Sequence, residues 1–208
     1  MSNQLNPQDT VLIVIDMQND FCHEDGASAK RGLADITAFQ ACVPKIDGLI
    51  GQARAVGVPV VFVYMTLDDT TISEAWTNKH GTGMSIVIKG SWGADFYKLY
   101  PQPGDAVVEK HRYSGFIGTN LNLILRSMGC KSIVLTGVLT NVCVESTARD
   151  GFMLDYNVTL VSDACAGSSP EAHAGTLANI ANVFGSVLSA EQVGAAWSAA
   201  ASPVEASA

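Results

Sequence analysis

The chain has 208 residues, of which 48% are apolar and 15% charged, and its net charge is −8. This length accommodates one full hydrophobic core, and we predict a single domain over residues 1–208. The acidic balance without a lysine or arginine cluster argues against a nucleic-acid or membrane partner, and no apolar run approaches the length of a membrane span.

Apolar runs alternate with helical patterns along the chain, which is typical of an α/β protein with a parallel sheet. Residues 10–16 read TVLIVID, a continuous apolar run that predicts a buried strand. Residues 33–56 carry apolar side chains at helical spacing and stop at Gly57, which favours a helix with a C-terminal cap. Residues 58–65 and 105–110 predict a second and a third strand.

The second half of the chain continues this alternation. Residues 119–128 predict a helix with Thr119 as N-cap and Gly129 after its end. The remaining predicted elements are a strand at 132–137, a helix at 142–155, a strand at 157–164, a helix at 170–182, a short strand at 185–188 and a helix at 190–199.

Two segments depart from the pattern. Residues 66–104 form a polar excursion longer than an ordinary loop, and we predict that it is a lid or a pocket wall. Residues 198–208 are small and polar, which predicts a frayed tail.

Three chemically useful residues stand at predicted strand ends. Asp16 ends the first strand, Lys110 ends the third, and Cys143 follows the fourth at the start of a helix. Ligands of open parallel sheets bind at the carboxyl ends of the strands, so these side chains are expected at one rim. An acid, a base and a thiol at one rim together indicate a catalytic site, although each residue alone is only weak evidence for one.

Each of the three has a functional and a structural interpretation. The first turn of a helix favours a thiolate at Cys143, which would make it a nucleophile, but cysteine is also a common small core residue. Asp16 could be a general base or a turn residue. Lys110 could hold Asp16 ionised or be an ordinary surface lysine.

Histidines and cysteines are spaced too irregularly to indicate a metal site, and no cofactor is expected. His111 is the only histidine near a strand end, and it is expected to point to the face opposite Lys110. The five cysteines include no C-x-x-C pair, which predicts neither disulfides nor a zinc knuckle. Because the N-terminus also lacks a signal peptide pattern, we predict a reduced, cytoplasmic protein.

Three motifs in this order resemble the isochorismatase-like cysteine hydrolases. They are VLIVIDMQNDF at the first strand, VVEKHRYSGFIGTNL after the excursion and LTGVLTNVCVESTARDGF at the fourth strand. The resemblance implies a three-layer, doubly wound parallel sheet. It also implies that Asp16, Lys110 and Cys143 are catalytic. The family's cis peptide would fall at Val138–Leu139, so that the N–H groups of Leu139 and Cys143 would form an oxyanion hole.

Members of this family that lack the cysteine include vinyl-ether hydrolases of isochorismate, so Cys143 favours the acyl-transfer branch. Nicotinamidases carry an Asp-x-His metal motif after the second strand, whereas this chain reads YMTLDDTT there. The motifs are most similar to amidohydrolases of ureides and carbamoyl compounds such as ureidoacrylate, biuret and N-carbamoylsarcosine. Ureidoacrylate amidohydrolases carry Asn and Trp where this chain has Met65 and Leu67.

The resemblance thus implies hydrolysis of a small linear ureide or carbamoyl compound through a thioester, by a homodimer or homotetramer. The alternatives are another carboxamide hydrolase of the nicotinamidase kind, a non-catalytic binding protein of the same fold, and a redox sensor that would need Cys165 or Cys22 as a resolving thiol. The candidate substrate contacts are a rim amide and four aromatic side chains: Gln18, Phe21, Trp76, Tyr113 and Phe116.

Overall fold

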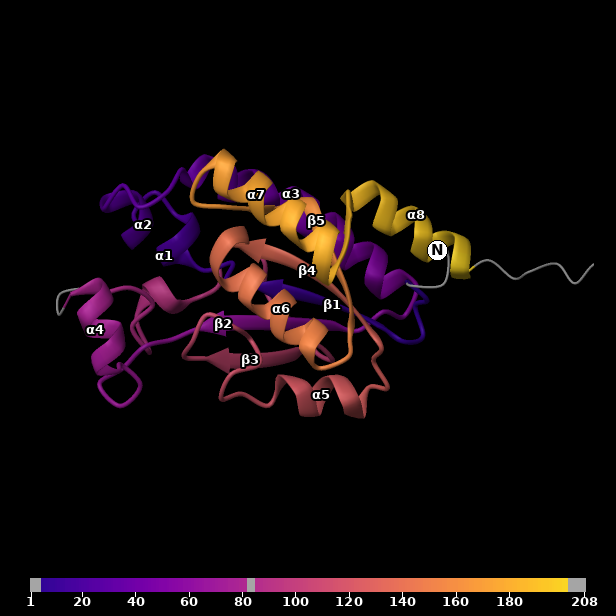
Figure 1. Cartoon of the computed structure of the whole chain (residues 1–208), viewed down its shortest axis with the longest axis horizontal. Helices are drawn as coiled ribbons and strands as arrows, with labels where there is room; N and C mark the ends of the chain where they lie inside the picture. Colours follow the sequence, from indigo (N-terminus) through magenta and orange to yellow (C-terminus); the bar gives the residue numbers. More distant parts are fainter. Residues whose placement is uncertain (1–4, 82–84, 202–208) are drawn as a thin grey trace, which may run out of the picture.

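A six-stranded parallel sheet with the order β3-β2-β1-β4-β5-β6 forms the centre of the computed structural model, which describes residues 5–81 and 85–201 (Figure 1). This confirms the predicted class, an α/β protein with a parallel sheet. The strands lie where the alternation predicts them: β1 (Thr10–Ile15), β2 (Val60–Met65), β3 (Ala106–Lys110), β4 (Ser132–Val138), β5 (Asn157–Ala166) and β6 (Gly185–Leu188).

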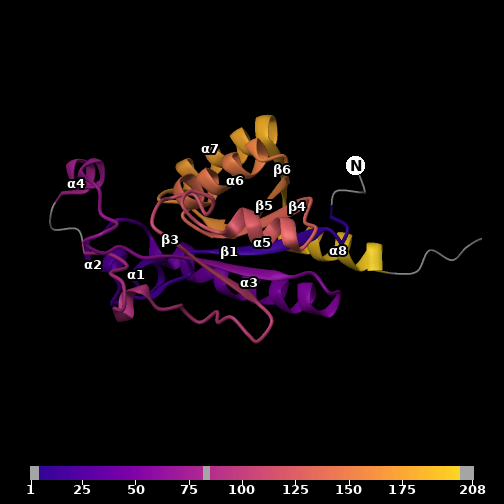
Figure 2. The same ribbon diagram turned by 90° about the horizontal axis from the view of Figure 1, so that it is seen from below.

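Helices cover both faces of the sheet, so the molecule has three layers. Figure 2 shows α3 below the sheet and α5, α6 and α7 above it, and α8 packs in the same core cluster as α3. The helices are α1 (Asn19–Cys22), α2 (Ala27–Lys30), α3 (Ile36–Ala55), α4 (Glu74–His80), α5 (Leu121–Ser127), α6 (Glu145–Met153), α7 (Pro170–Asn179) and α8 (Ala190–Ala201).

The continuous apolar run of β1 is explained by its central place in the sheet. Every residue of β1 is buried, and successive side chains point to opposite faces. Leu12 and Val14 pack in the core on the α3 side, whereas Val11, Ile13 and Ile15 pack in the core on the α5 and α6 side. Each such fully buried side chain contributes about 1.5–3 kcal/mol to the free energy of unfolding.

Element ends differ from the prediction in several places. The predicted helix at 142–155 is a π-helical turn, Thr140–Val144, followed by α6, and a second π turn, Ile180–Phe184, follows α7. The tail predicted to fray from residue 198 is helical as far as Ala201, because α8 is held by Trp197, which is fully buried in the core. Residues 202–208 lie outside the described part of the chain.

The strand order places a topological switch point between β1 and β4. From β1 the chain builds outward through β2 and β3, and it then crosses back to build β4, β5 and β6 on the other side. The strand ends at this point open a crevice, where ligands of such sheets bind. Figure 1 shows α1, α2 and α4 gathered around this end of the sheet. Within the described ranges, no helix has the length and apolar character needed to cross a membrane.

Candidate active site

The three residues selected from the sequence come together at this switch point. Asp16 follows β1 directly, and Lys110 is the last residue of β3, two strands away. The lysine side chain reaches across the end of β2, so that its Nζ lies 2.8 Å from Oδ2 of Asp16. Both side chains are almost completely buried, at 0% and 1% exposure. The thiol of Cys143 lies near both, close enough for each of the two charged groups to influence its pKa.

Backbone geometry at the ends of β1 and β4 positions these groups. Asp16 has a φ of 52°, in the left-handed region that aspartate tolerates better than most residues. Gly137 has a φ of 110°, and a Cβ there would overlap the carbonyl oxygen of Ile15, so only glycine lets the two strand ends approach. The Val138–Leu139 peptide bond that follows is cis.

Cys143 lies in the π turn rather than at the start of a regular α-helix, and side chains on the β5–α7 side anchor this turn. Thr140 Oγ1 lies 2.8 Å from Nδ1 of His173 on α7. Asn141 donates through Nδ2 to Ser168 Oγ at 3.0 Å and accepts from the Ser168 amide at 2.9 Å. These bonds hold Thr140 and Asn141, the first two residues of the turn that carries Cys143, which restricts the position of the thiol.

Burial dominates the electrostatics of the site. It raises the pKa of Asp16, and the neighbouring Lys110 ammonium offsets this only in part. Burial by itself would lower the pKa of Lys110, but the charges of Asp16 and Cys143 outweigh it and raise that pKa instead. The arrangement can therefore keep Lys110 charged beside a carboxyl group that is more basic than an ordinary aspartate.

Burial also raises the pKa of the Cys143 thiol, and Lys110 offsets this rise only in part. This corrects the sequence-based expectation that a helix start would favour a thiolate at this position. The thiol is protonated in the resting site because it is enclosed by apolar groups, which penalise an extra negative charge. Such a thiol could act as a nucleophile only if a base accepted its proton, and Asp16 is the nearby carboxyl group that interacts with it.

Buried thiols elsewhere lead to a prediction about alkaline stability. Burial raises the pKa values of Cys42 and Cys130 to about 12. Between the ordinary thiol pKa of 9.0 and these values, the unfolded chain loses protons that the folded chain keeps. The free energy of unfolding should therefore fall as pH rises above 9, by about 1.4 kcal/mol per pH unit and per thiol. Urea denaturation from pH 7.5 to 10.5 measures this, and Cys130→Ala should give a shallower slope; an unchanged slope would contradict the assignment.

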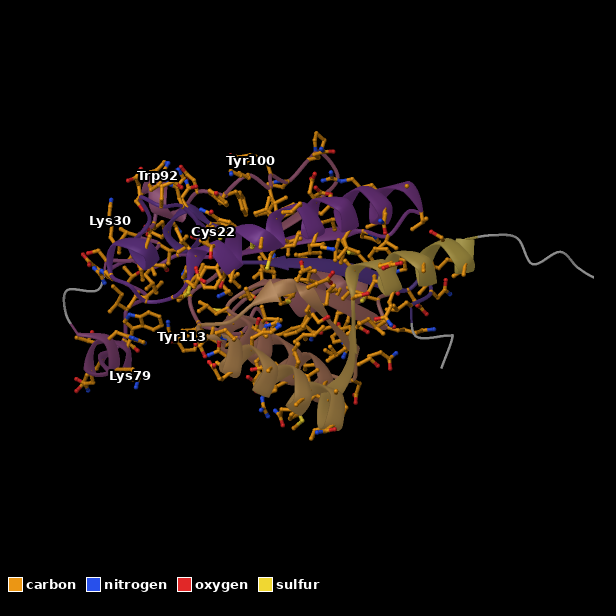
Figure 3. All side chains as sticks on the ribbon, turned by 90° about the horizontal axis from the view of Figure 1, so that it is seen from above. Cys22, Lys30, Lys79, Trp92, Tyr100 and Tyr113 are labelled. Atoms are coloured by element: carbon orange, nitrogen blue, oxygen red, sulfur yellow. The ribbon has the colours of Figure 1, made fainter. Side chains whose placement is uncertain are left out.

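A cavity of about 280 Å³ opens beside Cys143. Its walls come from both halves of the chain, and the predicted excursion contributes one of them through α4. Tyr113, labelled in Figure 3, lies at the same end of the molecule as α4 with Lys79. The cavity is lined by Phe21, Ser28, Leu33, Ala34, Met65, Trp76, His80, Ile86, Tyr113, Leu139, Val142 and Cys143.

Of the four aromatic residues predicted as substrate contacts, Phe21, Trp76 and Tyr113 line this cavity. Phe116 does not, which corrects the prediction for that residue. Its ring is 8% exposed in the core on the α5 and α6 side and stacks on Tyr156, with 5.9 Å between ring centroids. Phe116 lies three positions after Tyr113, and the bend of the intervening chain turns its ring into the core.

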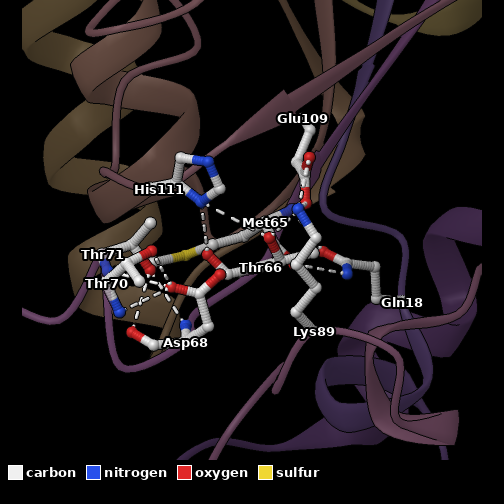
Figure 4. Close-up of polar contacts among 9 residues, drawn as sticks. All are labelled: Gln18, Met65, Thr66, Asp68, Thr70, Thr71, Lys89, Glu109 and His111. Carbon is white, nitrogen blue, oxygen red and sulfur yellow. Dashed lines mark hydrogen bonds and ion pairs between the residues drawn. The ribbon is translucent and has the colours of Figure 1, made fainter.

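Gln18 also has a different role from the one predicted. Its Nε2 donates to the carbonyl oxygens of Met65 at 2.8 Å and Ala94 at 2.7 Å, and its Oε1 accepts from the Met65 amide at 2.8 Å. Figure 4 shows the amide against Met65. With donor and acceptor both occupied and the side chain fully buried, Gln18 fastens the end of β2 to the excursion and does not bind a substrate amide.

Replacing Gln18 by leucine should therefore destabilise the fold and leave substrate affinity almost unchanged. The variant would strand a buried amide and two carbonyl groups, at a cost of about 2–3 kcal/mol. Urea denaturation measures the loss, and KM of the remaining folded enzyme tests the second part. A large rise in KM at unchanged stability would restore Gln18 as a substrate contact.

His80 is a cavity residue that the sequence reasoning missed. Its Nε2 lies 2.8 Å from the hydroxyl of Tyr113, and its ring is 4.5 Å from that of Trp76 between centroids. The spacing of Trp76 and His80, one helical turn apart, was the available signal. His111, by contrast, points away as expected, with Nδ1 2.9 Å from the carbonyl oxygen of Thr66 (Figure 4). In the part of the chain that the structure covers, no three potential ligand side chains are grouped to hold a metal ion.

Comparison with known proteins assigns this arrangement to a family. Residues 10–192 match the isochorismatase domain. The chain is 38% identical over 201 residues to ureidoacrylate amidohydrolase RutB of Pantoea ananatis, covering 88% of this chain and 80% of that protein.

Solved structures agree with this assignment. A cysteine hydrolase from Pseudomonas syringae pv. phaseolicola superposes with a TM-score of 0.85 at 29% identity, over 95% of this chain and 96% of the other. N-carbamoylsarcosine amidase from Thermoplasma acidophilum superposes with a TM-score of 0.73 at 30% identity, over 88% and 97%. The chain belongs to the isochorismatase family of hydrolases.

Proposed function

We propose that this protein is a cysteine-dependent amidohydrolase that cleaves a C–N bond of a small linear ureide or carbamoyl compound through a thioester. The class of reaction follows from the family and from relatives named as ureidoacrylate amidohydrolase and N-carbamoylsarcosine amidase. The observation that carries the mechanism is the buried thiol of Cys143 in contact with the ion pair of Asp16 and Lys110.

Acylation begins with proton transfer from the thiol to Asp16. The sulfur of Cys143 then forms a bond to the substrate carbonyl carbon, and the carbonyl electron pair moves onto its oxygen. The N–H groups of Leu139 and Cys143 bind this oxyanion, an interaction worth about 3–4 kcal/mol for each donor. When the intermediate collapses, the C–N bond breaks and Asp16 returns the proton to the leaving nitrogen.

Deacylation uses the same groups in reverse. Asp16 takes a proton from water, the resulting hydroxide adds to the thioester carbon, and the C–S bond breaks. Cys143 recovers its proton from Asp16, and a terminal ureide releases carbamate, which decomposes to ammonia and carbon dioxide. Lys110 stays charged throughout and stabilises the ionised form of Asp16.

Ammonia release by the purified full-length chain tests the proposal. The panel contains biuret, triuret, ureidoacrylate, N-carbamoyl amino acids and nicotinamide, each assayed with and without chelator. We expect release from at least one ureide, slower release from nicotinamide and no dependence on the chelator. Release from nicotinamide alone would favour the carboxamide alternative, and silence across the panel would favour a non-catalytic protein of this fold.

A further inference from the structure

The cavity beside Cys143 has few polar and no strongly basic groups. Aliphatic and aromatic side chains make up most of its wall, and among the described lining residues there is no lysine or arginine. The polar side chains besides Cys143 are Ser28, Trp76, His80 and Tyr113, and the last two are hydrogen-bonded to each other at 2.8 Å.

Among the described residues, the cation that acts on the thiol is Lys110, and it is already paired. Nζ of Lys110 lies 2.8 Å from Oδ2 of Asp16 and donates to the carbonyl oxygen of Arg112 at 3.1 Å. An anionic substrate entering the cavity would lose its hydration and would meet the buried Asp16, and the described lining residues include no lysine or arginine to balance its charge. Burying a charge under these conditions is strongly unfavourable.

We infer that the site selects uncharged ureides or amides whose non-reacting part is small and apolar, and discriminates against substrates that carry a carboxylate. This inference rests on the proposed function and narrows its substrate class. The volume of about 280 Å³ limits the substrate to a compact molecule. The buried Nε1 of Trp76 has no hydrogen-bond partner among the described residues, so the wall offers one neutral donor to an acceptor on the substrate.

Three ureas of matched shape test the charge selectivity. They are 3-methylbutylurea, 3-ureidopropanamide and 3-ureidopropanoate, which end in an isopropyl, a carboxamide and a carboxylate group. At pH 8 we expect kcat/KM to fall in this order, with the apolar urea at least about 100-fold above the carboxylate. Faster hydrolysis of the carboxylate would overturn the inference while leaving the proposed amidohydrolase function intact.

Alkylation of Cys143 tests the same property without relying on hydrolysis. Iodoacetamide and iodoacetate both form a C–S bond with loss of iodide and of the thiol proton to solvent, but only iodoacetate is anionic. Mass spectrometry of the Cys143 peptide gives the rate of each, relative to glutathione. We expect the ratio of the iodoacetamide rate to the iodoacetate rate to be larger for Cys143 than for glutathione, even if no ureide proves to be a substrate. An equal or smaller ratio would overturn the inference.

A positive charge introduced at the mouth of the cavity gives a variant that tests the charge selectivity directly. Leu33 lines the cavity and is 45% exposed, so Leu33→Arg can be accommodated without burying the new charge. It should raise the relative rate of iodoacetate, and of 3-ureidopropanoate where that is hydrolysed, by about fivefold. Leu123→Arg, at a 71% exposed leucine of α5 outside the cavity lining, is the control and should change neither rate. Equal effects of the two variants would contradict a local role of the cavity wall.

Discussion

Replacing Cys143 by serine is expected to lower kcat by about 10⁴- to 10⁶-fold, the range found when an enzyme loses its covalent nucleophile. The reason lies in the proton affinity of the site. Burial already raises the pKa of the thiol, and the raised pKa of Asp16 brings the base closer to it. A serine hydroxyl is far less acidic than a thiol, so Asp16 cannot deprotonate it during the attack. Steady-state ammonia release on the best substrate of the panel measures the effect.

The fold of the Cys143→Ser variant should be unchanged, because serine is close to cysteine in size and fills the same buried position. Urea denaturation of the variant checks this. The control is Cys130→Ser, at a partly buried cysteine that donates to the carbonyl oxygen of Ser132 and lies outside the cavity. The control should keep its activity. Substantial turnover by Cys143→Ser would contradict the covalent mechanism.

Replacing Lys110 by methionine is expected to reduce the free energy of unfolding by about 3–5 kcal/mol at pH 8, since it leaves the buried Asp16 without its partner. Activity should fall as well, because the unpaired carboxyl group would hold a proton and lose its function as a base. Methionine preserves the length and apolar stem of lysine, so the effect reports the charge rather than a cavity. Urea denaturation at several pH values is the measurement.

The pH dependence of this loss distinguishes a broken ion pair from simple loss of packing. Without Lys110 the pKa of Asp16 rises further above its ordinary value of 3.8. A carboxyl group with a raised pKa in the folded state destabilises the fold increasingly as pH rises from that ordinary value to the raised one. The variant should therefore be less destabilised at pH 5 than at pH 8. A loss that is the same at both values would indicate packing.

Lys131→Met is the matched control for this experiment. Its Nζ lies 3.7 Å from Oδ2 of Asp9, and its side chain is 75% exposed. Exposed pairs of this kind contribute about 0–1 kcal/mol, so the control should change stability little. If both lysine variants lost the same free energy of unfolding, burial of the ion pair of Asp16 and Lys110 would not explain its contribution to stability.

Much of this protein follows from local sequence patterns. Buried strands such as residues 10–15 are recognisable because a strand covered on both faces must be apolar throughout. The topology of a parallel sheet then brings the strand ends to one rim. For this reason Asp16, Lys110 and Cys143 could be selected together before their positions were known.

The roles of several other residues depend on contacts between segments far apart in the chain, and these contacts are visible only in the tertiary structure. Gln18 has the residue type of a substrate ligand, but its partners Met65 and Ala94 are remote in sequence, and they occupy its amide completely. Phe116 turns into the core and His80 into the cavity for similar reasons.

The sequence by itself determined the class of the fold and which three candidate catalytic residues meet at one rim, since these depend on periodicity and on strand ends. The protonation of Cys143 and the apolar, uncharged wall of its cavity depend on burial by many distant residues, which only the folded chain creates. Desolvation acts on the assembled site and has no local signature in the sequence, and so the preference for uncharged substrates that we infer rests on the tertiary structure.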